Sequence, residues 1–263
     1  MPTLKINGTE LAYTDTGSGP ALLLLHGFPL DRRIFDDLLP ILSKKNRVIT
    51  LDQRGFGQSK PSEFTTLNQL ADDVHEVIKQ LKLDKPVLGG LSMGGYVAQA
   101  FVKKYPNELK GLILFDTKSE ADTEEGKAGR NKMIESAKSG GSKAVAEQML
   151  PKMLAPQTPE KNPALKESAR KIMEACPVAT IVSALTAMRD RDDFRPLLPS
   201  IKFPVLLVFG KDDQISPLKI GESIKAALPN ATLDAIPDAG HLSTMEQPKA
   251  VAESVARFLE KIG

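Results

Sequence analysis

In Pro86-Val87-Leu88-Gly89-Gly90-Leu91-Ser92-Met93-Gly94-Gly95, a short apolar run meets a serine that has a glycine two positions away on each side. We expect a strand over residues 86–88 and a helix from about Gly94 to Tyr105, with Ser92 in the turn between them. Such a turn brings the residues on either side of the serine close together. Glycine at positions 90 and 94 removes the Cβ atoms that would collide there. The stretch therefore predicts a strained strand–turn–helix unit.

Ser92 gains a chemical meaning from this placement. The turn exposes its hydroxyl above the strand ends and at the start of the following helix, where partial positive charge favours a developing anion. An ordinary glycine-rich turn would also fit the same residues. A serine hydroxyl is a poor nucleophile at neutral pH and needs an adjacent base, so the partners of Ser92 decide between the two interpretations.

Strand-like and helical runs alternate on both sides of this stretch. Apolar and β-branched runs predict eight strands, at residues 4–6, 11–14, 21–25, 48–51, 86–88, 111–115, 204–209 and 232–236. Helices are expected after the cap residue Asp31, after the capping box Thr66-Leu67-Asn68-Gln69, and over residues 94–105, 217–228 and 249–262. The alternation predicts an α/β fold with a mostly parallel sheet flanked by helices.

The alternation breaks between about Ser119 and Arg195. This segment is rich in Lys, Glu, Ala and Met, and it predicts several short helices with no strand among them. We therefore expect a core formed by residues 1–118 and 196–263, with residues 119–195 as a helical cap inserted after strand six. Five of the eight methionines fall in the cap; they line an adaptable pocket or simply pack between cap and sheet.

The chain has only three histidines that could serve as the base. His241 follows the last strand, and loops at the carboxyl ends of parallel strands are where such sheets bind ligands. His241 is therefore the expected base, and His26 is the alternative. His26 ends a buried strand, where we expect it to shape the loop by hydrogen bonding. His75 lies beside the apolar stripe of a helix as a boundary residue.

A carboxylate must orient that base and stabilise its charged form. Asp212 and Asp213 both follow the strand over residues 204–209, at its carboxyl end. Asp116 follows the strand over residues 111–115 and could also present an acid to the base. Residue order and position alone leave these three carboxylates open.

A tetrahedral intermediate also needs backbone N–H groups that face its oxyanion. Met93, the residue after the nucleophile, offers one such group. His26-Gly27-Phe28-Pro29 ends another strand, and Phe28 offers the second. The segment from Asp52 to Ser59 contains several polar residues; we expect a structured loop held by an Asp52–Arg54 contact. Cys176 is expected to be a bystander thiol.

The composition of the chain argues against several kinds of binding partner. The chain carries 35 basic and 33 acidic residues, with no basic stripe, so no nucleic-acid partner is expected. The early apolar run over residues 21–25 is too short to span a bilayer and lacks a basic flank, so neither a membrane partner nor a signal peptide is expected. The single cysteine forms no internal disulfide and favours a cytoplasmic protein. No residue spacing indicates a metal or another cofactor.

These motifs together resemble the α/β-hydrolase superfamily over nearly the whole chain. The resemblance rests on five segments, which are His26-Gly27-Phe28-Pro29, Asp52-x-Arg54-Gly55-x-Gly57-x-Ser59, Gly90-x-Ser92-Met93-Gly94-Gly95, Gly210-x-x-Asp213 and Gly240-His241. Within the superfamily, two segments resemble the small bacterial carboxylesterases close to 3-oxoadipate enol-lactonases, namely 115–123 and 239–248. The resemblance implies a triad of Ser92, Asp213 and His241, oxyanion donors at Phe28 and Met93, and a helical cap over the site.

The resemblance implies a serine carboxylesterase that hydrolyses small, short-chain acyl esters through an acyl-enzyme, with a small-molecule ester as its partner. A lactonase, a carbon–carbon bond hydrolase or a perhydrolase could use the same triad. A third hypothesis is a ligand receptor built on a hydrolase fold without catalysis. Dehalogenases and epoxide hydrolases of this fold carry Asp in place of the serine, so Ser92 argues against both.

Overall fold

In the computed structural model, which describes all residues from Met1 to Gly263, the strands form one sheet in the order β1-β2-β4-β3-β5-β6-β7-β8. The β1–β2 and β2–β4 pairs are antiparallel, and every other pair is parallel. The predicted mostly parallel eight-stranded sheet is confirmed. The strands are β1 Thr3–Ile6, β2 Thr9–Thr16, β3 Ala21–Leu25, β4 Arg47–Leu51, β5 Val87–Leu91, β6 Gly111–Phe115, β7 Val205–Gly210 and β8 Ala231–Ile236.

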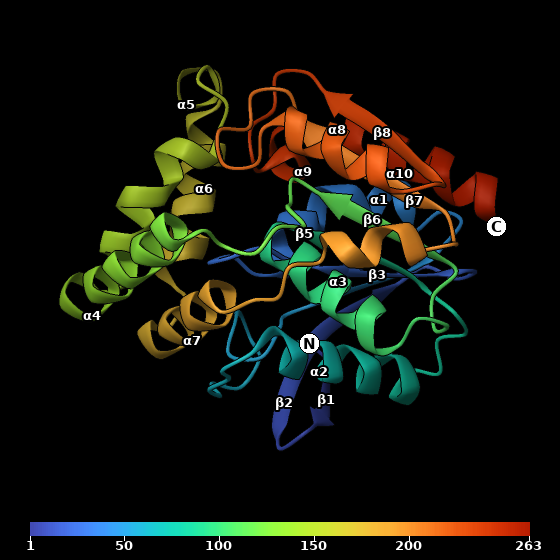
Figure 1. Cartoon of the computed structure of the whole chain (residues 1–263), viewed down its shortest axis with the longest axis horizontal. Coiled ribbons are helices and arrows are strands. Elements are labelled where there is room, and N and C mark those ends of the chain that lie inside the picture. The colour runs from blue at the N-terminus through green and yellow to red at the C-terminus, as the bar shows by residue number, and fades with distance from the viewer.

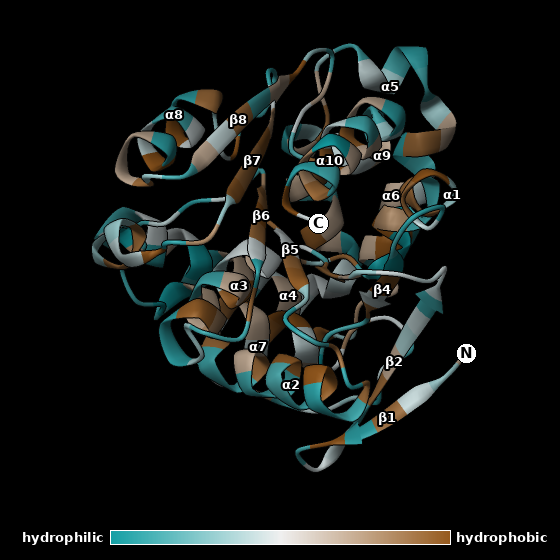
Figure 2. Cartoon of the chain, turned by 90° about the vertical axis from the view of Figure 1, so that its right-hand side faces the viewer, coloured by the Kyte–Doolittle hydropathy of each residue, from teal (hydrophilic) through white to brown (hydrophobic).

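The central strands are apolar throughout because helices cover both faces of the sheet. Every residue of β3, β5, β6 and β7 is buried. One core layer includes side chains of α2, α3 and α8, and the other includes side chains of η1, α1 and α10. In Figure 2 the middle of the sheet is brown, whereas the outer surfaces of the helices are largely teal. These helices are η1 Arg32–Leu38, α1 Leu39–Leu42, α2 Leu67–Gln80, α3 Met93–Lys104, α8 Leu218–Ala227, α9 Ser243–Glu246 and α10 Pro248–Ile262.

Two predicted helix caps are present. The Asp31 carboxylate accepts a hydrogen bond from the N–H of Arg33, although the helix it caps is the 3-10 helix η1. Thr66 and Gln69 form the reciprocal capping box of α2. Each side chain pairs a backbone N–H that has no partner within its own helix, and so each helix begins at a defined residue.

β5 is longer than predicted, and it continues to Leu91, immediately before Ser92. Gly89 and Gly90 take part in the sheet, where they pair with β3 on one side and β6 on the other. Glycine usually weakens a strand, but here it makes space: a Cβ on Gly89 would lie 2.6 Å from Leu24 Cδ2. The missing Cβ therefore lets the side chain of Leu24 pack against β5, while pairing on both sides continues the strand up to the serine.

A helical insertion follows β6, as predicted, and lies to one side of the sheet (Figure 1). Its first helical stretch, α4, covers 30 residues and consists of two helices joined at a kink at Gly141, whose φ is +71°. None of the helices is by itself long and apolar enough to cross a membrane. The helices between β6 and β7 are α4 Glu124–Met153, α5 Thr158–Lys161, α6 Pro163–Glu174, α7 Val178–Arg189 and the 3-10 helix η2 Arg195–Ser200.

Candidate active site

Ser92 occupies the strained turn between β5 and α3 that the sequence predicts. Its φ of +52° and ψ of −111° lie in a region that a residue with a side chain rarely adopts, at a cost of about 1–3 kcal/mol. A Cβ on Gly90 would overlap the carbonyl of Gly94, and one on Gly94 would overlap the carbonyl oxygen of Leu25. The two glycines therefore permit the turn, and the sheet and α3 hold it in place.

The structure brings His241 and Asp213 to this serine from loops far along the chain. His241 Nε2 lies 2.8 Å from Ser92 Oγ, although the two residues are 149 positions apart in sequence. His241 Nδ1 lies 2.8 Å from Asp213 Oδ2. Asp213 follows β7 and His241 follows β8, so both come from the carboxyl edge of the sheet. Hydrogen bonds thus link the carboxylate to the imidazole, and the imidazole to the hydroxyl.

The surroundings of Asp213 keep it ionised. Its Oδ1 accepts hydrogen bonds from the N–H groups of Ile215 and Ser216, at 2.7 and 2.9 Å. Burial alone would raise the pKa of Asp213, but electrostatic attraction to the His241 ring, the hydrogen bond from that ring and these two backbone hydrogen bonds outweigh it and lower the pKa. A carboxylate at Oδ2 can only accept, so Nδ1 of His241 carries the proton and Nε2 is free to accept from Ser92.

The other two candidate carboxylates form no hydrogen bond or ion pair with His241. Asp212 accepts a hydrogen bond from Gln157 Nε2 at 3.2 Å. Asp116 accepts the N–H of Gly210 at 2.7 Å and the hydroxyl of Ser243 at 2.5 Å, so it links β7 to the segment after His241. Complete burial, together with the charge of Asp213, raises the pKa of Asp116 well above its ordinary value.

His26 lies at the end of β3, and both of its ring nitrogens face backbone groups. Nδ1 lies 2.9 Å from the carbonyl oxygen of Gly27, and Nε2 accepts the N–H of Gln53 at 3.1 Å. Burial lowers the pKa of His26, which keeps the ring neutral. With both nitrogens engaged, His26 has no free position for Ser92, and it shapes the loop as expected.

The loop after His26 lies directly against the serine. A Cβ on Gly27 would lie 3.2 Å from Ser92 Cβ, so only glycine lets this backbone come so close. The N–H of Phe28 has no acceptor in the protein. The N–H of Met93 belongs to the first residue of α3, where no intrahelical acceptor exists. Both predicted donors are thus unpaired and belong to segments that meet at Ser92.

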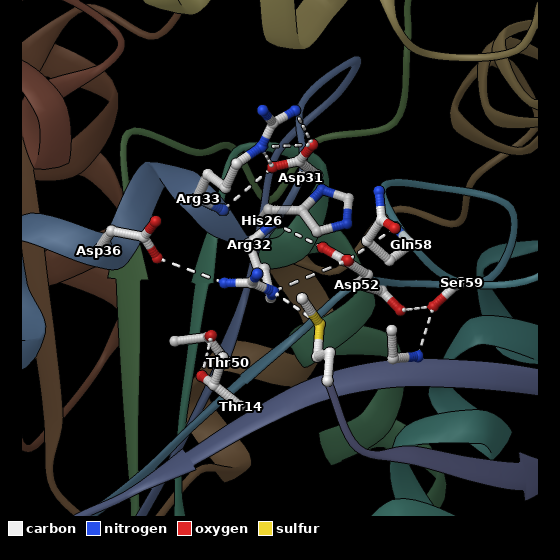
Figure 3. Close-up of polar contacts among 12 residues, drawn as sticks. Thr14, His26, Asp31, Arg32, Arg33, Asp36, Thr50, Asp52, Gln58 and Ser59 are labelled. Atoms are coloured by element: carbon white, nitrogen blue, oxygen red, sulfur yellow. Dashed lines mark hydrogen bonds and ion pairs between the residues drawn. The ribbon is translucent and has the colours of Figure 1, made fainter.

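The expected contact between Asp52 and Arg54 is wrong. Arg54 forms a two-pronged ion pair with Asp73 of α2, at 2.7 and 2.8 Å. Asp52 instead accepts the N–H groups of Arg32 and Gln58, both at 2.9 Å (Figure 3). The planar guanidinium matches one carboxylate in this way, while Asp52 binds the loop backbone. The loop is structured, but by different partners from those expected.

His75 and Cys176 lie away from the serine and do not join it. The ring of His75 stacks on Tyr105, with 4.0 Å between ring centroids. Cys176 is buried in the helical insertion, and burial raises the pKa of its thiol. Neither residue forms a hydrogen bond with Ser92, Asp213 or His241.

Two residues near the site were not predicted. The hydroxyl of Thr117 donates a 2.7 Å hydrogen bond to the carbonyl oxygen of Ser92. Glu246 accepts the N–H of Gly240, directly before His241, at 2.7 Å. Both lie in segments that support the family resemblance, 115–123 and 239–248, which is the only sequence signal that could have indicated them.

A family model, described as the alpha/beta hydrolase fold, matches residues 20–248. The chain belongs to the α/β-hydrolase family. This α/β hydrolase is 38% identical to a thermophilic esterase from Thermogutta terrifontis, and their structures agree with a TM-score of 0.97 over 100% of this chain and 99% of that one. It is 32% identical to the AB hydrolase superfamily protein YisY of Bacillus subtilis, over 94% of each chain.

A further relative is 3-oxoadipate enol-lactonase 1 of Acinetobacter baylyi, which is 26% identical over 99% of this chain and 93% of that protein. The predicted membership of the superfamily, with esterases and enol-lactonases as relatives, is confirmed. In chemical terms, the site joins a hydroxyl, a base with a fixed tautomer, an ionised carboxylate and two free N–H donors. Such an arrangement can transfer an acyl group from an ester to water.

Proposed function

We propose that this α/β hydrolase is a serine carboxylesterase that hydrolyses small, short-chain acyl esters. The observation that carries the proposal is the pair of 2.8 Å contacts that join Asp213, His241 and Ser92. The esterase from Thermogutta terrifontis supports the ester as the bond that is cleaved. The unpaired N–H groups of Phe28 and Met93 support their role as the oxyanion donors.

In the first half of the reaction, Ser92 Oγ attacks the ester carbonyl carbon while His241 Nε2 removes the hydroxyl proton. The carbonyl oxygen becomes an oxyanion, and the N–H groups of Phe28 and Met93 donate to it. Asp213 stabilises the imidazolium that forms and does not take the proton itself. His241 then delivers the proton to the alcohol oxygen, the bond between the carbonyl carbon and that oxygen breaks, and an acyl-Ser92 remains.

In the second half, a water molecule replaces the alcohol. His241 Nε2 removes a proton from the water, whose oxygen attacks the acyl carbon and forms a second oxyanion at the same two donors. The ester bond to Ser92 then breaks, and the proton on His241 returns to Ser92 Oγ. The acid leaves and the enzyme is restored.

We also propose that residues 119–195 act as a cap on a core formed by residues 1–118 and 196–263. The helices α4 to α7 fall within the proposed cap, and their buried methionines Met153, Met173 and Met188 belong to the packed interior. Because the cap lies beside the carboxyl edge of the sheet, it would select the acyl and alcohol groups that reach Ser92.

Lactone hydrolysis is the second candidate, and the kinship with enol-lactonase 1 of Acinetobacter baylyi favours it. A lactone is an internal ester, so the same attack by Ser92 opens its ring, and the alcohol stays attached to the acyl group. The two candidates therefore differ in what the cap admits and share one mechanism.

The test compares hydrolysis of p-nitrophenyl acetate, p-nitrophenyl butyrate and a set of simple lactones by the wild-type enzyme and by Ser92→Ala. We expect the linear esters to give the highest kcat/KM, and Ser92→Ala to lose turnover of every substrate. Full turnover by Ser92→Ala would contradict the nucleophile. A higher kcat/KM on lactones than on linear esters would leave the proposed mechanism unchanged and make a lactone the proposed substrate.

A further inference from the structure

Glu246, at the end of α9, connects two parts of the molecule that are distant in sequence. Its Oε1 accepts the N–H of Ala155 at 2.8 Å and the hydroxyl of Thr158 at 2.5 Å. Its Oε2 accepts the N–H of Gly240, the residue before His241, at 2.7 Å. Ala155 and Thr158 belong to the helical insertion, 91 and 88 positions from Glu246. One side chain therefore joins the insertion to the loop of the proposed base.

Neighbouring contacts also join residues 153–158 to the loops at the carboxyl edge of the sheet, and we call this set of contacts the seam. The N–H of Leu242 donates to the carbonyl oxygen of Met153 at 3.1 Å. Gln157 Nε2 donates to Asp212 and Asp238, both at 3.2 Å. The segment therefore lies along the loop that precedes Asp213 as well as the loop that carries His241. A Cβ on Gly240 would lie 2.6 Å from the nitrogen of Ala155, so the two backbones are in close contact.

The three groups that face Glu246 are all donors: two backbone N–H groups and one hydroxyl. A carboxylate can accept on both oxygens, so it satisfies all three at once. Glutamine has one acceptor oxygen and an NH₂ group that only donates. Whichever way it turns, at least one backbone N–H would face another donor. Glu246 forms no ion pair, so charge neutralisation does not explain its position.

We propose that Glu246 is a positioning residue, which fixes the cap segment 153–158 to the His241 loop and so sets the cap and the base in one common geometry. The proposal rests on the proposed function, because His241 must be the base for its position to matter. A displacement of about 1 Å in a catalytic group can lower a rate by about 100-fold, so a loosened loop has a measurable effect.

The test uses Glu246→Gln, with Asp234→Asn as its matched control. Asp234 is also a partly buried carboxylate, but it bridges Ser254 and Arg257 of α10 and has no contact with the seam. Two readouts are needed: the rate at which a small fluorophosphonate labels Ser92, and hydrogen exchange in peptides that cover residues 153–158 and 239–243. The small phosphonate reports on the activation of Ser92 with little dependence on the cap.

We expect Glu246→Gln to label about 10- to 100-fold more slowly and to lose kcat by a similar factor, with faster exchange in both peptides. Asp234→Asn should match the wild type in all of these. A Glu246→Gln enzyme with wild-type kcat and labelling rate would overturn the proposal, even if it unfolds at a lower temperature. If Glu246→Gln does not fold, Glu246→Asp, which is too short to reach both sides, carries the same expectations.

Thr158→Val separates the two sides of the seam. It removes only the hydroxyl donor and leaves Glu246 bonded to Gly240. We expect faster exchange in residues 153–158, unchanged exchange in residues 239–243, and a wild-type labelling rate. A labelling rate as low as that of Glu246→Gln would overturn the role of the Gly240 contact. By contrast, absence of labelling in the wild type itself would contradict the proposed function and not the seam.

Discussion

Two buried carboxylates, Asp116 and Asp213, follow the neighbouring strands β6 and β7, and the structure gives them opposite environments. Asp213 is surrounded by donors and by His241, so its pKa is lowered. Asp116 is completely buried beside the charge of Asp213, so its pKa is raised. Asp213 is therefore suited to stabilise a cation, whereas Asp116 favours its neutral, protonated form.

The carboxylate that orients the base can be identified by comparing Asp213→Asn with Asp116→Asn. Asp213→Asn should lower kcat by about 10³- to 10⁴-fold, because an amide NH₂ favours the wrong tautomer of His241. Asp116→Asn should keep kcat within about tenfold, since its amide can still accept from Gly210 and can pair with Ser243. Steady-state kinetics on p-nitrophenyl butyrate measures both values. If Asp116→Asn lost more kcat than Asp213→Asn, the carboxylate that orients the base would be Asp116, after β6, and not Asp213.

Asp116 should also make stability depend on pH. Its pKa in the folded protein is raised above the unfolded value of about 3.9. Its contribution to the free energy of unfolding is therefore fully present below the unfolded pKa, and it is lost as the pH rises through the folded pKa. Relative to the wild type, Asp116→Asn should therefore gain unfolding free energy as the pH rises, with a slope of up to about 1.4 kcal/mol per pH unit.

Urea unfolding of both proteins between about pH 5 and pH 8 measures this difference, and Asp213 does not contribute to it because its lowered pKa keeps it ionised over this range. A difference that does not rise with pH would mean that the pKa of Asp116 is not raised in the folded protein.

At the residue scale, sequence reasoning led to Ser92, His241 and the loop of Asp213, because each follows a strand at the same edge of the sheet. It could not separate Asp212 from Asp213 without the family resemblance. The difference depends on the local turn in which the N–H groups of Ile215 and Ser216 face Asp213 Oδ1. The Arg54–Asp73 pair was missed because an aspartate in an amphipathic helix is expected to face solvent.

At the scale of elements, the turn at Ser92 depends on close approach between α3 and β3. Gly94→Ala should lower the free energy of unfolding by about 3 kcal/mol, the upper end of the overpacking range, because its Cβ would overlap the carbonyl of Leu25. Gly129→Ala in α4 is the matched control: it is exposed, and no atom lies within 4 Å of its added Cβ. It should raise the same free energy by about 0.5–1 kcal/mol.

Chemical denaturation of the two variants measures these changes. If Gly94→Ala is as stable as the wild type and keeps its kcat, the turn does not require the close approach that the structure contains.

Element positions were predictable because apolar runs and caps are local signals. The deviations arise from contacts across the fold. β5 continues through Gly89 and Gly90 because neighbouring strands pair with both glycines. α4 is two helices in succession, because the positive φ of Gly141 breaks the helical backbone between them.

At the scale of the whole molecule, Asp122 and Arg191 close the helical insertion where it leaves and rejoins the core. Arg191 Nη1 lies 2.6 Å from Asp122 Oδ1, and the Arg191 side chain is 2% exposed. The guanidinium also stacks on the ring of Tyr96 of α3, 4.4 Å from its centroid. Entry and exit of the insertion are thereby fixed to each other and to the core.

Arg191→Ala should lower the free energy of unfolding by about 3 kcal/mol, since it breaks a largely buried pair and removes a stacked cation, while Asp122 keeps Arg130. Lys45→Ala removes a pair with Glu260 whose side chains are 74% and 57% exposed, and it should leave the free energy of unfolding nearly unchanged, because solvent screens such a pair. Urea unfolding tests both. If Arg191→Ala changed the free energy of unfolding no more than Lys45→Ala does, the Arg191 contacts would not hold the ends of the insertion together.

The overall plan, a sheet with a helical insertion after β6, could be predicted from the alternation of runs and its interruption. The contacts that join insertion and sheet could not, since they pair residues about ninety positions apart, as in Glu246 with Ala155. Spacing rules act over one or two helical turns, so such pairs emerge only when the fold is known.

The central claim, that Ser92 is an activated nucleophile, is tested most directly by mass spectrometry after treatment with a fluorophosphonate. We predict one covalent adduct per chain, located on Ser92 and absent from Ser92→Ala. The rate of its formation should fall strongly in Asp213→Asn, because the base is no longer oriented. A native wild-type protein that forms no adduct, or an adduct that persists unchanged in Ser92→Ala, would contradict the claim.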